Sequence, residues 1–546
     1  MANAYRHPGV YIEELPGPQQ ISGVGTSTTV FVGWTEGGTV NQPVLIDSWN
    51  AFTRTFGNFV WGHNVPFAVY NFFAEGGSLC YVVRAAANPP ASMTFATSVQ
   101  GSLTVRAAAP GVWGNKLAVL IENFPMENPP SATAKPTFVL RVLYAAPPTG
   151  TPPTILDALV ARYVVSNQLP SVATSSQTFW VLEEFSGLTS ADLAKPVVTA
   201  QSAIESRINS QSLFIRASVT DITGTRPPNV IIPAPLAGGA GDAKTTPTDY
   251  ASALTSLNPL NDINLLVLPD TGMVDDYGTQ RTLVQQALTY CESRTPRDLF
   301  LIADTPVGLT VEELVAFKSG TASSSGLVPA GNALNSSYGA LYCPWMDFFN
   351  GLTSRSVPIP PSGAIAGTYA ETDRRVGVFK APAGVLDGKL ASAVGLTTLF
   401  TTTDQDVLNP NGINAIRNLP RYGIVTYGAR TLSTDPSLTY ISVRRLLIYI
   451  EISLYWGMQW VVFEPNDQKL WGAVNRDVTQ FLTSVWQAGG LFGAREAEAF
   501  LVQVDAGNNP PETRNQGQLF IDISVAPVRP AEFVIIRIQQ ATLPTG

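Results

Sequence analysis

Two consecutive helix patterns between residues 440 and 487 constrain the fold of this chain more than any other stretch. The first, YISVRRLLIYIEISLYW (440–456), has apolar residues on every face, so we expect a helix that is buried all round. The second, 467–487, has Asn466 as its expected N-cap and Gly489-Gly490 as its expected stop. Its apolar residues form one stripe at helical spacing: Leu470, Trp471, Val474, Val478, Phe481, Leu482, Val485 and Trp486.

Three strand-like segments follow these helices, at 499–505, 518–527 and 532–540. The first two predict a pair of strands that lies beside the helices and has open edges. An open edge invites pairing with another strand. The third segment either folds back on its own subunit or reaches into another molecule, and the sequence pattern leaves both possibilities open.

The preceding chain alternates strand and helix patterns on either side of an insertion. Residues 26–85 and 236–349 carry apolar strands separated by helices, which predicts a sheet buried on both faces. Within them, 337–349 is expected to be one strand. Residues 86–235 have Pro-rich joins such as AAANPPAS and ENPPSATAKP, and predict a mostly β insertion with a helix near 199–208. The fold class is therefore α+β or α/β, with several domains.

Composition narrows the classes of function. Charged residues make up only 14% of the chain, and the net charge is −8 without any basic block. Direct nucleic-acid binding is therefore not expected. So little charge fits either a secreted β-rich protein or a surface largely covered by copies of the same chain.

The cysteines and the termini indicate neither disulfides nor export. Cys80, Cys291 and Cys343 are odd in number and far apart, which predicts buried reduced thiols. The N-terminus lacks the apolar core of a signal peptide. The apolar run 446–463 is interrupted by Glu451 and Gln459, so we expect a buried helix there and no membrane insertion.

No pattern of catalytic or ligand-binding residues stands out. His7 and His63 have no Cys, Asp or Glu at metal spacing, and no G-x-S-x-G elbow occurs. The adjacent carboxylates at 275–276 and 312–313 are typical of a turn and of the first turn of a helix. We therefore expect no enzyme activity, no metal and no cofactor.

Several segments resemble one protein family. VRRLLIYIEISLYWGMQWVVFEPNDQKLW (443–471), AFLVQVD (499–505) and SVAPVRPAEFVIIRIQQ (524–540) are similar to the C-terminal domain of contractile tail sheath proteins, from bacteriophages and phage-like injection systems. PGVYIEE, SWNAFTRTFG and PGVWGNKLAVLIEN resemble earlier parts of the same family, in order. The resemblance covers most of the chain and thins between about 145 and 180. The loop GGAGD (238–242) departs from the family's Gly-Gly-x-Asp-Gly pattern, so it is assigned no role beyond a turn.

The resemblance implies a structural subunit that is made in the bacterial cytoplasm and assembled into a phage tail or injection-system particle. Copies would form six-fold rings stacked helically around an inner tube, and contraction would drive the tube through a target envelope. The implied partners are the chain itself, the tube protein, and baseplate and terminator or cap proteins. The alternative is a secreted β-rich adhesin or carbohydrate-binding surface protein, which would require a signal peptide and paired cysteines.

The resemblance also implies a division of the chain. We expect an N-terminal extended arm (1–22), a discontinuous α/β core (23–90 with 236–435), an inserted β-rich outer domain (91–235), a tube-facing inner domain (436–530) and a C-terminal arm (531–546). The arms would add strands to the 499–505/518–527 pair of neighbouring copies through Val10, Tyr11, Ile12 and Glu13, and through Phe533, Val534, Ile535 and Ile536. Tube contact is expected opposite the apolar stripe, at Asn475, Asp477, Gln480 and Ser484.

Overall fold

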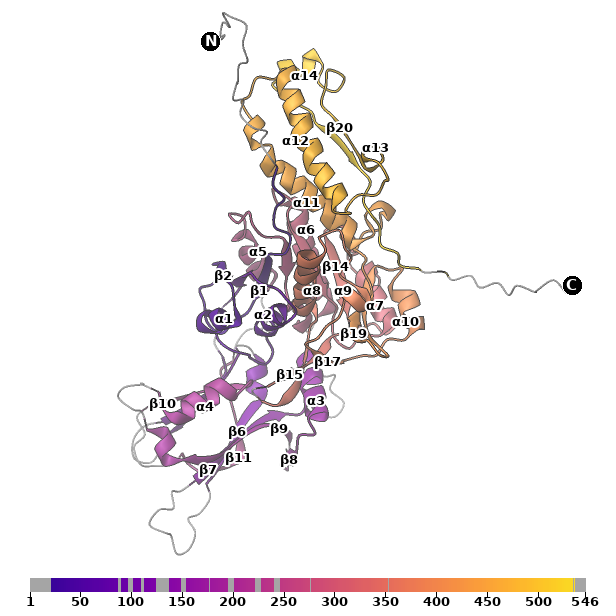
Figure 1. Ribbon diagram of the computed structural model, residues 1–546. Helices are drawn as coiled ribbons and strands as arrows, with labels where there is room; N and C mark the ends of the chain where they lie inside the picture. Colours follow the sequence, from indigo (N-terminus) through magenta and orange to yellow (C-terminus); the bar gives the residue numbers. More distant parts are fainter. Residues whose placement is uncertain are drawn as a thin grey trace, which may run out of the picture. The chain divides into compact units, whose positions relative to one another are not determined.

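The computed structural model divides the protein into two compact units, a smaller one of residues up to Val24 with Tyr449–Val528, and a larger one of Gly25–Ile448 with residues from Arg529 onward (Figure 1). We describe each unit by itself. The described residues are 21–86, 90–96, 102–109, 112–123, 137–148, 154–175, 177–194, 201–220, 227–239, 246–274, 276–351, 353–533 and 535.

The larger unit is built on a mixed eight-stranded sheet with the order β19-β18-β14-β13-β12-β1-β3-β2. The strands from β18 to β3 run parallel, and the edge strands β19 and β2 are antiparallel to their neighbours. Every residue of β1, β13 and β14 is buried, which confirms a sheet covered on both faces. The strands are β1 (Thr29–Gly33), β2 (Val44–Ile46), β3 (Cys80–Arg84), β12 (Leu265–Val267), β13 (Phe300–Asp304), β14 (Gly339–Cys343), β18 (Ile413–Leu419) and β19 (Gly423–Thr426).

Several helices around this sheet begin at residues whose side chains cap them. Ser48 accepts a hydrogen bond from the Ala51 amide at the start of α1, and Thr310 forms a capping box with Glu313 at α7. Asp276 caps α6, as a turn-forming carboxylate would. The helices are α1 (Trp49–Phe56), α2 (Val65–Ala74), α5 (Pro247–Thr255), α6 (Tyr277–Ser293), α7 (Val311–Ser319), α8 (Ser362–Arg375), α9 (Gly384–Asp387) and α10 (Thr402–Leu408).

Two glycines allow α8 to approach α2 closely. A Cβ on Gly363 would lie 2.3 Å from the Ala68 Cα, and one on Gly367 would lie 2.5 Å from the Phe72 carbonyl oxygen. Both distances are too short for any side chain. The close helix pair therefore depends on these two positions remaining glycine.

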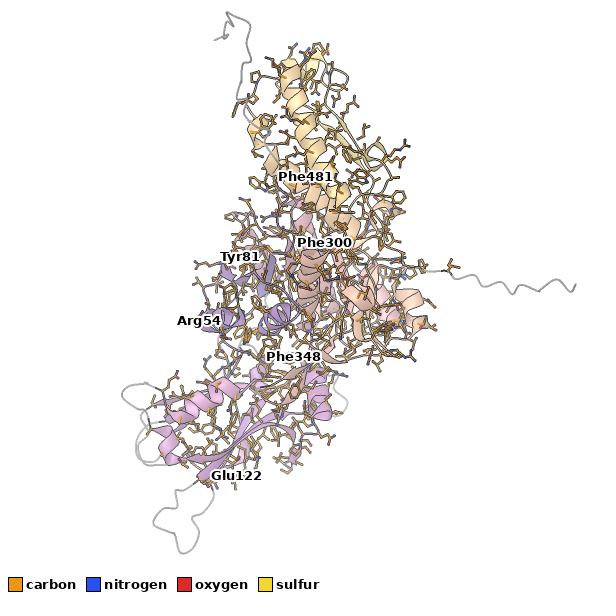
Figure 2. The ribbon with its side chains drawn as sticks, viewed as in Figure 1. Arg54, Tyr81, Glu122, Phe300, Phe348 and Phe481 are labelled. Carbon is orange, nitrogen blue, oxygen red and sulfur yellow. The ribbon has the colours of Figure 1, made fainter. Side chains whose placement is uncertain are left out.

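The expected single strand 337–349 is wrong. The structure contains two strands there, β14 and β15 (Met346–Asn350), and they belong to different sheets. Pro344 lies between them and has no amide proton to donate to a sheet, so one continuous strand cannot form. β15 pairs with β16 (Arg355–Ile359) and β17 (Ala393–Leu396). Phe348 of β15 packs its ring 5.4 Å from that of Tyr70 on α2 (Figure 2).

The insertion contains two antiparallel sheets, as its composition predicts. One has the order β10-β5-β4 and the other β11-β6-β7-β9-β8. The predicted helix near 199–208 is present as α4 (Ala203–Gln211), and a second helix, α3 (Ile155–Ser166), was not predicted. The strands are β4 (Ser92–Ala96), β5 (Ser102–Ala107), β6 (Leu117–Asn123), β7 (Thr137–Ala145), β8 (Ser171–Ala173), β9 (Thr178–Thr189), β10 (Ile215–Thr220) and β11 (Val230–Pro235).

Ion pairs fasten the insertion to the rest of the larger unit. Arg216 of β10 donates from Nε to Glu36 Oε1 at 2.9 Å, and its side chain is almost fully buried. Arg162 of α3 donates from Nη2 to Asp347 Oδ2 at 2.6 Å, close to β16, on which α3 packs. The inserted sheets therefore share charged contacts with the chain on both sides of them.

Two buried carboxylates tie the carboxyl end of the eight-stranded sheet to distant segments. Asp304, the last residue of β13, accepts hydrogen bonds from the Ser362 amide at 2.9 Å and from the Ser362 hydroxyl, at the start of α8. Asp270 accepts hydrogen bonds from the amides of Trp34, at 2.8 Å, and of Asn64. Burial raises the pKa of each carboxyl to about 7.

Replacing Asp304 with Asn should flatten the pH dependence of stability. Because the pKa of Asp304 is higher in the folded state than in the unfolded chain, the folded state binds this proton more tightly. Its stabilising contribution is therefore present at low pH and is lost as the pH rises through about 7. Between about pH 6 and about pH 8 the wild type should lose about 1.4 kcal/mol of unfolding free energy that Asp304→Asn does not lose.

Urea denaturation of the two proteins at both pH values measures this difference. Asn can still accept the hydrogen bond from the Ser362 amide, so the variant should fold. Asp406→Asn, at an exposed position, is the matched control and should keep the wild-type slope. Identical slopes for the wild type and Asp304→Asn would show that Asp304 takes up no proton on folding.

Candidate assembly interface

The two helices predicted between residues 440 and 487 are present as α11 (Ile441–Gly457) and α12 (Gln468–Gln487). The part of α11 up to Ile448 belongs to the larger unit, and the part from Tyr449 belongs to the smaller one. The expectation that α11 is buried all round is wrong in its second half, where Glu451, Tyr455 and Trp456 are exposed. A carboxylate in mid-helix is costly to bury without a partner, which favours an exposed face there.

The stripe of α12 is confirmed with two corrections. Asp467, not Asn466, is the N-cap, because its carboxylate accepts from the amides of Lys469 and Leu470 at 2.9 and 3.0 Å. Asn466 instead accepts from the indole nitrogen of Trp471 at 2.8 Å. Trp486 is only half-buried and donates its indole N–H to the Gly493 carbonyl. Asp and Asn are nearly equal as caps, so sequence alone could not separate adjacent candidates.

The predicted strand pair beside these helices is β20 (Phe500–Gln503) with β21 (Asp522–Val525). The strands are antiparallel, and Phe500 lies opposite Val525 and Gln503 opposite Asp522. Within the described part of the chain, no third strand joins this sheet. The pair therefore retains outer edges that can accept a strand.

The chain enters the smaller unit along the second half of α11. The Val24 amide donates to the Ser453 hydroxyl at 3.2 Å. Gly23 lies against Tyr449, whose hydroxyl oxygen would be 2.0 Å from any Cβ at that position. Ile21 packs on Gly457, where a Cβ would be 2.7 Å from the Ile21 Cγ2. Residues 21–24 thus form a fixed N-terminal root, while Val10, Tyr11, Ile12 and Glu13 lie outside the described residues.

The C-terminal segment has a root of its own, in the larger unit. Arg430 donates from Nε to Glu532 Oε1 at 3.0 Å and from Nη2 to Glu532 Oε2 at 2.5 Å. The two side chains are only 17% and 13% exposed, and the hydrogen bonds to Glu532 raise the pKa of the guanidinium. Beyond this clamp, Phe533 is 74% and Ile535 is 78% exposed. Val534 and Ile536 lie outside the described residues.

The four residues predicted to face a tube do not form one solvated face. Gln480 and Ser484 are exposed, and Asn475 is half-buried with its amide nitrogen 3.4 Å from the Val502 carbonyl. Asp477, however, is only 2% exposed. It lies in a groove that Ile21 also lines. Helical spacing puts Asp477 three residues after Val474 and four before Phe481, at the edge of the apolar stripe, so the prediction that it lies opposite the stripe is wrong.

Sequence reasoning missed a buried ion pair at the start of α11. Arg445 donates to both carboxylate oxygens of Asp373 on α8, at 2.9 and 2.6 Å, and to the Thr26 carbonyl at 2.9 Å. The available signal was a pair of arginines, Arg444 and Arg445, inside an otherwise apolar helix. Such residues need partners when buried.

The histidine and cysteine side chains that were considered as catalytic or metal-binding residues are packed in the protein interior. His63 is buried, and its ring stacks on Trp34 at 4.2 Å between centroids. All three cysteines are buried and unpaired, as predicted, and burial raises the pKa of each thiol. In the described ranges, no three His, Cys, Asp or Glu side chains come together as a metal site. None of the helices described here has both the length and the apolar run that a membrane span requires.

Gly23→Ala should detach the N-terminal root from α11. The added Cβ would overlap the Tyr449 hydroxyl, so residues 21–24 would shift and the Val24 amide would lose its bond to Ser453. We expect a loss of about 1–3 kcal/mol of stability and faster hydrogen exchange at Val24, measured by mass spectrometry. Gly25→Ala is the control, because its Cβ would lie 3.8 Å from the nearest atom, an ordinary contact. Unchanged exchange in Gly23→Ala would refute the docking described here.

Comparison with known proteins gives these features a context. Residues 433–541, which contain α12, β20, β21 and Glu532, match the family described as phage tail sheath C-terminal domain. The tail sheath protein of Vibrio phage KVP40 is 24% identical over 238 residues, which are 43% of this chain and 35% of that protein. The chain thus spans less than half the length of the phage relatives that it matches.

Two solved structures are similar along almost the whole chain. The sheath of the extracellular contractile injection system PVC, in its contracted state, is 21% identical with a TM-score of 0.55, and 99% of each chain is covered. The contracted helical sheath of the anti-feeding prophage is 22% identical with a TM-score of 0.55, covering 98% of this chain and 99% of that one. These structures show the fold of the chain, and the family match shows that residues 433–541 are similar to the C-terminal domain of phage tail sheath proteins.

Proposed function

We propose that this chain is the structural subunit of a contractile sheath, not an enzyme, and that copies of it polymerise around an inner tube. The observation that carries this proposal is the β20–β21 pair, which lies in the segment matched to sheath C-terminal domains and has edges that no other described strand occupies. A two-stranded sheet is marginal by itself and gains stability from further strands. A neighbouring copy is the natural source of such strands in an array of identical subunits.

The two chain ends supply those strands. The N-terminal arm uses Val10, Tyr11, Ile12 and Glu13, and the C-terminal arm uses Phe533, Val534, Ile535 and Ile536. Support comes from the exposed apolar side chains of Phe533 and Ile535, which follow directly on the Arg430–Glu532 clamp. Strand addition provides backbone hydrogen bonds, and the alternation of side chains fixes the register.

Contraction in this proposal is a switch between two packings of rigid subunits. The arms stay paired, while the larger units slide and make new contacts, which are favoured in the contracted state. Support comes from the fold shared with two sheaths solved in the contracted state. The movement shortens the array and drives the tube forward.

The placement of the domains in the array is part of the proposal. The insertion at 91–235 lies on the outer face, where its two separate sheets can vary without disturbing the eight-stranded sheet. The domain at 436–530 faces the tube, and of the four predicted contact residues on α12, Gln480 and Ser484 are exposed. Six-fold rings, a tube protein, baseplate and cap proteins, and a phage tail or injection-system particle complete the assembly.

Removal of residues 1–20 tests the arms. The truncated subunit should remain soluble and folded, with an unchanged circular dichroism spectrum, but should form no cylinders in negative-stain electron microscopy. The full-length chain should form long hollow cylinders. Normal cylinders from the truncated protein would end the arm proposal, and small uniform particles from the full-length chain would contradict the sheath function itself.

A matched variant separates strand pairing from the mere presence of the segment. Replacing residues 10–13 with Ser-Gly-Ser-Gly keeps the length, the prolines and the charge at position 6. Glycine and serine pair poorly as strands, so this variant should assemble as badly as the truncation.

A further inference from the structure

The groove beside α12 contains a buried carboxylate oxygen without a partner. Asp477 Oδ1 accepts a hydrogen bond from Arg476 Nε at 3.2 Å, whereas Oδ2 has no donor among the described residues. The Asp477 side chain is 1% exposed, and that of Arg476 is 58% exposed. Burying a carboxylate oxygen without a hydrogen-bond donor costs free energy. A donor from another molecule that bonds to this oxygen would recover that free energy on binding.

The groove has room for such a donor and suits a cation. Its volume is about 380 Å³. Phe481, which is labelled in Figure 2, is one of the residues that line it. Most of the lining is polar: Ile21, Asp477, Gln480, Phe481, Thr483, Ser484 and Gln487. The Thr483 hydroxyl donates to Glu496 Oε1 at 2.7 Å and is therefore already used. The side-chain amide oxygens of Gln480 and Gln487 are further acceptors that a cation could use. An ionised carboxylate only accepts, and a guanidinium only donates, through five N–H groups.

We propose that this groove binds the guanidinium of Arg6 from the N-terminal segment of a second copy of this chain. Arg6 is the single Lys or Arg in the first 20 residues. Ile21, where that segment meets the described structure, lines the same groove, so every N-terminal segment starts beside one such site. The proposal rests on the proposed function, because it names the contact by which one copy holds the next.

Geometry favours a second copy over the segment's own groove. Pro16 and Pro18 come shortly before Ile21, and they disfavour an immediate return of the chain because they fix φ and restrict the residue before them. The chain from Arg6 to Ile21 makes fifteen Cα-to-Cα steps and can span about 50 Å when extended. That reach exceeds the diameter of a small domain, about 30 Å, so Arg6 can arrive at an adjacent copy.

The groove can bind Arg6 without blocking contact with the tube. Asp477 is buried at the floor of the groove, whereas Gln480 and Ser484 are exposed at its rim. The tube could therefore contact the rim while Arg6 occupies the floor.

Isosteric and charge-removing variants test the contact. Asp477→Asn and Arg6→Gln should each lower the apparent association constant of assembly about tenfold or more, measured as the concentration at which cylinders form. The double variant should be no weaker than either single variant, because both remove one shared interaction. Thr513→Ala, at a half-buried position on the short helix α14 (Pro511–Asn515), should assemble like the wild type.

Cysteine cross-linking identifies the source of the cation. In the variant with Arg6→Cys and Asp477→Cys, oxidation of assembled protein should produce a ladder of linked subunits under denaturing conditions. Asn515→Cys in place of Asp477→Cys is the control and should produce none. The native cysteines are all buried and should not interfere.

Three results would overturn the inference. A cross-link confined to one subunit would place Arg6 in its own groove. Wild-type assembly by Asp477→Asn, with loss of a co-purifying tube protein, would assign the groove to the tube. Additive effects of the two single variants would show that Arg6 and Asp477 do not meet. By contrast, a wild-type chain that forms no cylinders would remove the proposed function and this contact with it.

Discussion

The buried ion pair between Arg445 and Asp373 is the constraint on which much of the larger unit depends. The side chains are 3% and 4% exposed, and Arg445 uses Nη2 a second time to hold the Thr26 carbonyl. Its guanidinium also stacks on Tyr369, whose hydroxyl meets that of Tyr342 on β14 at 2.6 Å. Removing either charge would leave the other buried alone, at a cost of about 3–5 kcal/mol. The ion pair therefore fixes the relative positions of three segments: the start of α11, helix α8 and the residues before β1.

The Arg445–Asp373 pair matters for the N-terminal root because Arg445 lies on α11, the helix that this root contacts. The helix is continuous from Ile441 to Gly457, and its second half carries the N-terminal root, Ile21 to Val24. The first turns of α11 are held by the Arg445–Asp373 pair, and Glu532 is held by Arg430. In the proposed array, these two pairs would bear a pull on the N-terminal and on the C-terminal arm. Charge-assisted bidentate pairs are strong and directional, which suits contacts that must carry load.

Sequence patterns predicted what periodicity and capping control, namely both C-terminal helices, the β20–β21 pair and most strands of the large sheet. They failed where one residue or a distant contact decides. Pro344 splits a run that otherwise reads as one strand. The helix α3 has apolar residues on all sides, so it shows no stripe, although Thr154 and Asp157 form a capping box that marks its start. The burial of Asp477 could have been predicted, because helical spacing puts it at the edge of the apolar stripe beside Val474 and Phe481. The groove itself could not, because Ile21, which also lines it, is more than 450 positions earlier in the chain.

The surface of the smaller unit suggests why its burial is incomplete in a single subunit. Phe463 is 102% exposed in a left-handed backbone conformation with φ of 72°, and Phe492, Leu501 and Phe520 are exposed as well. A non-glycine residue in that backbone conformation is strained. Exposure of an aromatic ring to water also costs free energy that burial would recover. Together with the buried Asp477 Oδ2, which has no donor among the described residues, and a sheet of only two described strands, these features are unfavourable in isolation and become favourable when covered. In the proposed array, a neighbouring copy would cover these groups and so stabilise the smaller unit.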